Sequence, residues 1–369
     1  MPMPPRRFPS PSLCRTLSRP LSRRLPGTLA CLALCLFLCL SSLPVHAAQP
    51  ATAGTVCLLL ESLTPDKGWH DQLRAGLARA EKDFGITARV VAAPADSDQQ
   101  AIFREEAARS DLVLVADDSL HEVLRNNAGN FRKVHFGCID TGVRAANIMS
   151  VTFADEQAAF LAGAAAAMLT VSDSRGMNPQ KTLGWLSGKE TGPIVTMLNG
   201  FLEGARLIDP EIRIVHRSLD SFEDTQRAQA GCRELLAEGA DIVVLAAGSA
   251  GLAALDVLAG QQALAIGMAE DQDRLRPGQV LTSILKQGDR AVYEIVSSHV
   301  RGNFRGGDIV TYTLADKGVG ITDLRSFAAG EGNKLPPRLA SRLTELRREL
   351  ERQAIRLPSL RQGTLCNCR

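Results

Sequence analysis

Residues 264–286, LAIGMAEDQDRLRPGQVLTSILK, are the stretch that decides how the chain is interpreted. Residues 264–268 and 280–285 are short and largely apolar, as β-strands are, and the AEDQD segment after the first run is acidic and polar. Ligands of open α/β sheets bind just past the carboxyl ends of the strands. This loop, together with the Lys286 that ends the second strand, is therefore predicted to lie at the mouth of a ligand cleft.

Strand and helix patterns alternate through most of the chain. Apolar runs of strand length are separated by runs of helical periodicity between residues 55 and 139, and the same alternation returns between residues 182 and 268. Such alternation predicts parallel sheets covered by helices on both faces. We expect an α/β protein of two doubly wound lobes, joined by a hinge with a cleft between them.

The expected lobe boundaries follow from these two repeats. The first lobe is assigned residues 55–153 and the second residues 154–271. Each lobe is expected to be completed by a later segment, at about residues 272–304 for the first and about 305–322 for the second. In this interpretation the strand at 280–285 returns the chain to the first lobe, and a strand at 309–313 returns it to the second.

Residues 323–369 form a C-terminal extension of different composition. Leu339, Leu343, Leu346 and Leu350 recur at helical spacing among many arginines, which predicts an amphipathic helix. Docking of this helix on a lobe is the interpretation that the pattern favours, and binding of a partner is the alternative.

Residues 1–47 have the pattern of a secretory signal peptide. Six arginines and no acidic residue precede an apolar run at 29–43, and Val45-His46-Ala47 supplies small residues at the positions that signal peptidase requires. The apolar run is short for a membrane span, so an uncleaved anchor is the weaker alternative. We expect cleavage after Ala47, a linker at 48–54, and a periplasmic or otherwise exported protein.

The charge and the cysteines limit the possible partners. Removing the six arginines of the signal from the 42 basic residues leaves 36 against 40 acidic residues, so nucleic-acid binding has no support. Cys57, Cys138 and Cys232 lie in apolar patterns and are expected to be buried. Cys366 and Cys368 can pair with each other under strain or with another chain, but they supply too few ligands for a metal site.

Several motifs in order resemble those of a known family. They begin with DKGWHD at residue 66 and FADEQAAFLAG at residue 153, and continue as NGFLEGARLIDPEI, LDSFEDTQ, ADIVVLAAGSAGL, IGMAEDQ, VLTSILKQGDRAVY and ADKGVGI. The chain is similar, from about residue 55 to 322, to the basic membrane protein family of periplasmic substrate-binding proteins. The characterised members of that family are purine-nucleoside receptors of ABC transporters.

The resemblance implies a fold and a function. The fold would be that of the type I periplasmic binding proteins, with two lobes that close on a ligand. The function would be delivery of a nucleoside-like ligand, by a monomeric receptor without enzymatic activity or cofactor, to an ABC permease and its ATPase.

The resemblance also implies the main ligand contacts. Trp69 matches an aromatic residue that can stack on a purine, and Phe222 matches a second one, so the two could sandwich a ring. Asp140 ends the fourth strand, where the family has a carboxylate that contacts the base; a strand-end turn residue is the alternative. Lys286 matches a lysine that binds the sugar hydroxyls.

His70, Asp71 and Gly248 complete the expected site. The sequence departs from the family at His70 and at Ala269. His70 stands where the family has asparagine. Asp71 follows in the same motif, with helix capping as its alternative role. Gly248 would let the backbone approach the ligand, although a plain turn glycine is nearly as well supported. Ala269 replaces an acidic residue that would accept ribose hydroxyls, so a less hydroxylated ligand is compatible with the sequence.

Two other functions are consistent with parts of the sequence. A sensor could use the same fold to present its ligand to a signalling partner. A nucleoside-cleaving enzyme is less consistent, because the sequence contains no G-x-S-x-G, no H-E-x-x-H and no phosphate-binding P-loop.

Overall fold

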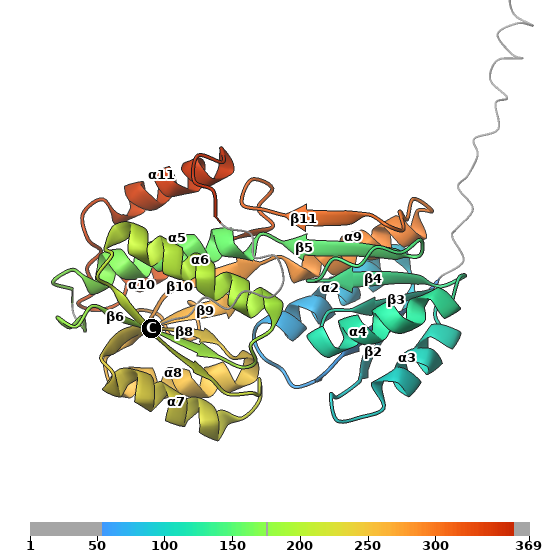
Figure 1. Ribbon diagram of the computed structural model, residues 1–369, viewed down its shortest axis with the longest axis horizontal. Coiled ribbons are helices and arrows are strands. Elements are labelled where there is room, and N and C mark those ends of the chain that lie inside the picture. Colours follow the sequence, from blue (N-terminus) through green and yellow to red (C-terminus); the bar gives the residue numbers. More distant parts are fainter. Residues whose placement is uncertain (1–53, 175, 358–369) are drawn as a thin grey trace, which may run out of the picture. The chain divides into compact units, whose positions relative to one another are not determined.

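The computed structural model describes residues 54–174 and 176–357 (Figure 1). The expected signal peptide, nearly all of the linker, and Cys366 and Cys368 lie outside the described residues. Within them, no helix has the length and apolar character needed to cross a bilayer.

The first sheet has six parallel strands in the order β11-β5-β4-β3-β1-β2. Its strands are β1 Thr55–Leu60, β2 Thr87–Ala92, β3 Leu112–Val115, β4 His135–Ile139, β5 Ile148–Phe153 and β11 Ile309–Tyr312. The helices of this lobe are α2 Trp69–Phe84, α3 Gln99–Ala108, α4 Asp118–Asn127 and α9 Gly288–Val300, with a short 3-10 helix, η1 Ala128–Asn130.

The second sheet has the order β12-β10-β9-β8-β6-β7 and is parallel except for β12. Its strands are β6 Thr182–Ser187, β7 Arg213–Ser218, β8 Ala240–Ala246, β9 Leu264–Ala269, β10 Val280–Lys286 and β12 Val319–Ile321. The helices of this lobe are α5 Asp155–Thr170, α6 Gly192–Ile208, α7 Thr225–Ala237, α8 Gly248–Gly260, α10 Arg325–Ala328 and α11 Leu339–Glu351.

Helices cover both faces of each sheet, because alternate side chains of a strand point in opposite directions. In β1, Leu58 belongs to a buried cluster with α2 and α9, whereas its neighbour Leu59 belongs to a cluster with α3 and α4. In β6, Trp185 packs with α5 and α6, and Leu186 packs with α7 and α8. The expected doubly wound α/β lobes are therefore confirmed.

The described chain passes between the two sheets three times, and two of the expected passages are wrong. Strand β10 pairs with β9 and β12 in the second sheet, so the return to the first lobe is made after it, by α9. Strand β11 pairs with β5 in the first sheet, so the return to the second lobe is made by β12. The errors have different causes. Strand β10 is apolar and buried on both faces, so it carries no local sign of which sheet it joins. Strand β11 is a short edge strand whose partner, β5, lies far away in the chain.

The amphipathic helix of the extension docks on the second lobe. Leu339, Leu343, Leu346 and Leu350 are all buried in α11, which packs against α5 (Figure 1). The structure thus supports docking over the alternative of a free partner-binding helix.

Helices α5 and α6 approach each other closely at glycines. A Cβ atom on Gly163 would lie 2.0 Å from the carbonyl oxygen of Phe201, and one on Gly204 would lie 1.9 Å from that of Phe160. Both distances are far below van der Waals contact, and backbone atoms cannot rotate away as a side chain can. The contact between these helices therefore requires glycine at both positions.

We predict that Gly163→Ala lowers the free energy of unfolding by about 1–3 kcal/mol or more, because the added methyl group must push α6 away. Gly260→Ala is the matched control, since Gly260 also belongs to a helix but has open space where its Cβ would be. The control should be neutral, or stabilising by up to about 1 kcal/mol. Urea unfolding of the two variants measures the difference, and equal effects would contradict the close packing.

Candidate functional site

Lys286 lies at the passage from the second lobe to the first. It ends β10, and α9 begins two residues later at Gly288. Its Nζ donates a hydrogen bond to Oδ2 of Asp155 at 2.9 Å and lies 2.5 Å from Oδ1 of Asp140. Asp155 begins α5 directly after β5, and Asp140 directly follows β4. One ammonium group therefore links three chain segments at the ends of both sheets.

The three charges are buried together. The side chains of Lys286, Asp155 and Asp140 are only 5%, 6% and 12% exposed. Burial alone would lower the pKa of Lys286, but the two carboxylates outweigh it and the pKa is raised. Burial raises the pKa of Asp155 to about 7; Lys286 opposes this shift and Asp140 adds to it. The lysine is therefore charged at neutral pH, beside a carboxyl group that burial makes easier to protonate than an exposed one.

Two aromatic rings lie against this ammonium group. The Lys286 Nζ is 5.0 Å from the ring centroid of Trp69 and 4.8 Å from that of Phe153. The two rings meet edge to face, with centroids 5.8 Å apart. A cation beside an aromatic ring is attracted by the negative face of the ring. Trp69 is only half-buried, so part of its ring remains available for stacking.

The backbone is strained at two strand ends near this cluster. Asp140 has φ 79° and Ala269 has φ 70°, both in the left-handed region. Aspartate adopts this region more readily than most residues, so the strain is greater at Ala269. Such conformations cost about 1–3 kcal/mol and are concentrated at binding and active sites. The two positions lie at the ends of β4 and β9, where ligands of α/β sheets bind.

His70 is bound within its own lobe. Its Nε2 lies 2.8 Å from Oδ1 of Asp117, whose Oδ2 accepts the backbone N–H of Glu61 at 2.7 Å. Burial disfavours a charge on the imidazole, but the hydrogen bond and the charge of Asp117 outweigh burial and raise the pKa of His70. A ligand could therefore form a hydrogen bond with His70 only at Nδ1, because Nε2 is already bonded to Asp117.

Asp71 supports the loop that precedes α2. Its Oδ2 accepts the backbone N–H groups of Asp66 and Lys67, and its Oδ1 pairs with Arg74. Burial opposes ionisation, but Arg74 and the Lys67 amide hold the pKa of this carboxyl below its usual range. These bonds favour the structural alternative for Asp71 over ligand binding.

Phe222 and Gly248 lie together in the second lobe. A Cβ atom on Gly248, which has φ 56°, would lie 3.1 Å from the Cβ and the carbonyl oxygen of Phe222. Phe222 also covers Gly188, and the Nζ of Lys189 lies 5.9 Å from its ring. Among the described residues, Trp69 and Phe222 make no direct ring contact, so a ring held between them stays a prediction.

Sequence reasoning missed the contacts that the loop after β1 makes with the second lobe. Oε2 of Glu61 accepts from Nζ of Lys189 at 2.8 Å, and Ser62 donates to Glu223. Gln272 donates to the carbonyl of Lys67 at 2.9 Å. Glu61 and Lys189 each follow the carboxyl end of a strand, which is the signal that could have identified them. The bond between Asp155 and Lys286 could not be found from local sequence, because the two residues lie 131 positions apart.

The comparisons with known proteins agree with this arrangement. Residues 53–355 match the model of the Bmp family, described as ABC transporter substrate-binding protein PnrA-like. The chain belongs to this family.

Proteins named basic membrane protein are similar to this chain over most of their length. Basic membrane protein B of Borrelia garinii subsp. bavariensis is 28% identical over 291 residues, which cover 74% of this chain and 82% of that protein. Basic membrane protein A of Borreliella burgdorferi is 25% identical over 295 residues, which cover 78% and 85%. As a member of the Bmp family, the chain is a substrate-binding protein of the kind that serves ABC transporters.

Solved structures confirm the type I fold of periplasmic solute-binding proteins expected for a Bmp protein. An ABC transporter solute-binding protein from Aeropyrum pernix K1 superposes with a TM-score of 0.75 at 20% identity, covering 83% of this chain and 94% of that one. A corresponding protein from Conexibacter woesei gives 0.62 at 21% identity, covering 83% and 99%. Both are described as solute-binding proteins of ABC transporter systems.

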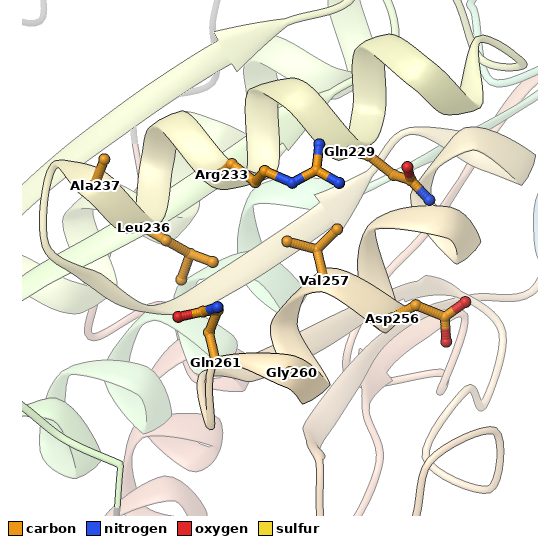
Figure 2. Close-up of a pocket in the computed structure, with 8 residues that line it drawn as sticks. All are labelled: Gln229, Arg233, Leu236, Ala237, Asp256, Val257, Gly260 and Gln261. Carbon is orange, nitrogen blue, oxygen red and sulfur yellow. The ribbon is translucent and has the colours of Figure 1, made fainter.

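A hollow of about 630 Å³ lies elsewhere on this Bmp protein, between α7 and α8. Figure 2 shows Arg233 and Leu236 of α7 facing Val257 and Asp256 of α8 across it. Because α7 and α8 run from the carboxyl ends of their strands towards the amino ends of the next, their last turns lie away from the ligand loops. The hollow contains none of the expected site residues.

We predict that Lys286→Met lowers the free energy of unfolding by about 3–5 kcal/mol at pH 8, because two buried carboxylates lose their only ammonium partner in the described residues. Adding Asp155→Asn should restore part of the loss by removing one of the charges. The pKa of Asp155 is raised, so its carboxyl binds a proton more readily in the folded protein than in the unfolded chain. The stability lost in Lys286→Met should therefore become smaller as the pH falls towards about 5. Urea unfolding at the two pH values tests this, and a loss below about 1 kcal/mol would contradict the ion cluster.

We predict that Asp117→Asn lowers the pKa of His70, because burial is then opposed only by the more weakly acting carboxylate of Asp66. A histidine whose pKa is raised in the folded protein contributes stability below about pH 6.5, which is lost as the pH rises through the folded value. The stability difference between wild type and variant should accordingly be largest in acid. NMR titration of the imidazole checks the pKa, and an unchanged value would show that Asp117 does not set it.

Proposed function

We propose that this Bmp protein binds a purine nucleoside or a close relative of one, after export through the signal at residues 1–47, and delivers it unchanged to the permease and ATPase of an ABC importer. The observation that carries the proposal is the buried Lys286, with Asp140 and Asp155 beside the half-exposed ring of Trp69.

The chemistry of this cluster suits a neutral, hydroxylated molecule with an aromatic ring. Stacking on Trp69 would contribute about 1–3 kcal/mol. The ammonium of Lys286 can donate to ligand oxygens, and the carboxylates of Asp140 and Asp155 can accept from hydroxyl groups.

The charge balance disfavours a phosphorylated ligand. Lys286 is already matched by two carboxylates, so the cluster carries no surplus positive charge for a phosphate. The phosphate of a nucleotide would add one or two negative charges next to the carboxylates of Asp140 and Asp155. Like charges in a buried site repel strongly. A nucleoside meets no such penalty.

The choice among nucleosides is expected to be relaxed. Ala269 offers no acceptor from its side chain, and Glu270 and Asp271 beside it are exposed. His70 is bound to Asp117. A site that lacks a hydroxyl-binding group discriminates weakly against a ligand that lacks the hydroxyl. Deoxynucleosides should therefore lose less affinity, relative to ribonucleosides, than they would at a site that has an acidic residue at position 269.

The test is a thermal-shift and calorimetric screen of the chain from Ala48 onward, which contains every described residue. The panel comprises inosine, guanosine, adenosine, their deoxy forms, the corresponding nucleotides, free bases, sugars and amino acids. Stabilisation by purine nucleosides and not by nucleotides is the expected result. If no purine nucleoside stabilises the protein, the proposal is wrong; recovery of free base would instead indicate an enzyme.

Variants locate the binding site. Trp69→Ala should abolish the shift, whereas Trp69→Phe keeps a ring and should retain part of it. Lys286→Met combined with Asp155→Asn should also abolish it, and its unfolding curve shows whether it is folded. Lys133→Ala is the control, because Lys133 is exposed and precedes β4, at the opposite end of that strand from Asp140. Unchanged binding in both site variants would place the ligand elsewhere.

A further inference from the structure

Gln72 is a buried polar residue that the sequence did not single out. It lies in α2 of the first lobe, and its residue is 9% exposed. Its Nε2 donates to the carbonyl oxygen of Ala269 at 2.7 Å, and its Oε1 accepts the backbone N–H of Gly288 at 2.9 Å. Ala269 ends β9 in the second lobe, and Gly288 begins α9 just after Lys286. One amide thus bonds to both segments.

The Gly288 N–H depends on this amide, and the Ala269 carbonyl accepts from it at a strained position. Gly288 is the first residue of α9, so its N–H has no partner within the helix. Ala269 is buried with left-handed φ, at the end of a strand. A glutamine side chain can donate to one group and accept from the other, which leucine or a carboxylate cannot do.

Trp69 contacts the same glycine from the same helix. Trp69 and Gln72 are three residues apart in α2, so they share one face. A Cβ atom on Gly288 would lie 2.7 Å from Cζ3 of Trp69, which shows how closely the indole covers this position. One turn further along, Gly76 lets α2 approach the backbone of Asp289. The start of α9 is thus held against α2 by Trp69, Gln72 and Gly76.

We propose that Gln72 is a positioning residue of the ligand site, which fixes the Trp69 ring relative to the Lys286 ammonium by bonding to Gly288 and Ala269. The 5.0 Å separation between ring and ammonium spans two elements, α2 and the end of β10. Gln72 belongs to α2, and it bonds to Gly288, which lies two residues after the end of β10. Gln272 makes a reciprocal bond from the second lobe to the carbonyl of Lys67.

Gln99 provides a matched control. It is also 9% exposed, and its Nε2 donates to the carbonyl of Ala93 and to Oγ of Ser119, both at 2.8 Å. All of these residues belong to the first lobe, and in the described part of the chain neither Lys286 nor Gly288 is a hydrogen-bond partner of Gln99 or Ser119. Ser119 itself donates to Glu61 at 2.5 Å. Gln72→Leu and Gln99→Leu each remove a buried amide, so both variants should lower the unfolding midpoint, and only the first should disturb Trp69.

The first readout needs no ligand. Trp69 and Trp185 are the only tryptophans of the chain, and Trp185 is buried with no hydrogen-bond partner for its Nε1 among the described residues. Trp185→Phe therefore loses no hydrogen bond and leaves Trp69 as the only indole. In that background, Gln72→Leu should raise acrylamide quenching of Trp69 about twofold or more, and Gln99→Leu should leave it unchanged. Equal quenching in the two variants would overturn the proposal.

The second readout rests on the proposed function and uses inosine. In the chain with both tryptophans, Gln72→Leu should raise the Kd for inosine about tenfold or more, and Gln99→Leu should leave it unchanged. Equal Kd values in the two variants would overturn the positioning role. If wild type binds no purine nucleoside, the proposed function fails by itself, and the quenching experiment still decides the role of Gln72.

Discussion

The contact between the Lys286 ammonium and the carboxylates of Asp140 and Asp155 is the interaction on which the rest of the site depends. A buried lysine is tolerated only with opposite charge beside it, and its two partners come from the ends of β4 and β5. The bond to Asp155 joins two of the three passages between the lobes, because Asp155 opens α5 and Lys286 closes β10. The same charges that suit a ligand therefore also hold the passages together.

This arrangement explains why so many loops converge on one place. The carboxyl ends of parallel strands leave backbone groups and short polar loops at one edge of each sheet. Here, the loop after β1 bonds to the second lobe at Glu61, Ser62 and Lys67. The amide of Gln72 continues these contacts towards Lys286. Trp69 is thereby held between the bonded loop and the ion cluster, although it is only the first residue of its helix.

Local features of the fold could be predicted from the sequence, and pairings over long distances could not. Helix α2 follows from the periodicity of its apolar residues, because a helix is specified by neighbouring residues. The sheet to which β10 and β11 belong depends on strands far away in the chain, and both assignments were wrong. The same limit applies to the site: Lys286 and Asp140 were expected to contact a ligand separately, but their contact with each other was not foreseen.

Ala269 shows how the ligand could change while the site keeps its shape. The resemblance implies an acidic residue there, and aspartate adopts left-handed φ more easily than alanine. Ala269 nevertheless has φ 70°, and its carbonyl is bonded to Gln72. The backbone geometry is thus maintained by a bond to the carbonyl, which does not depend on the side chain at that position. A substitution there can remove a hydroxyl-binding carboxylate without moving Trp69 or Lys286, so ligand choice and the architecture of the site are free to vary separately.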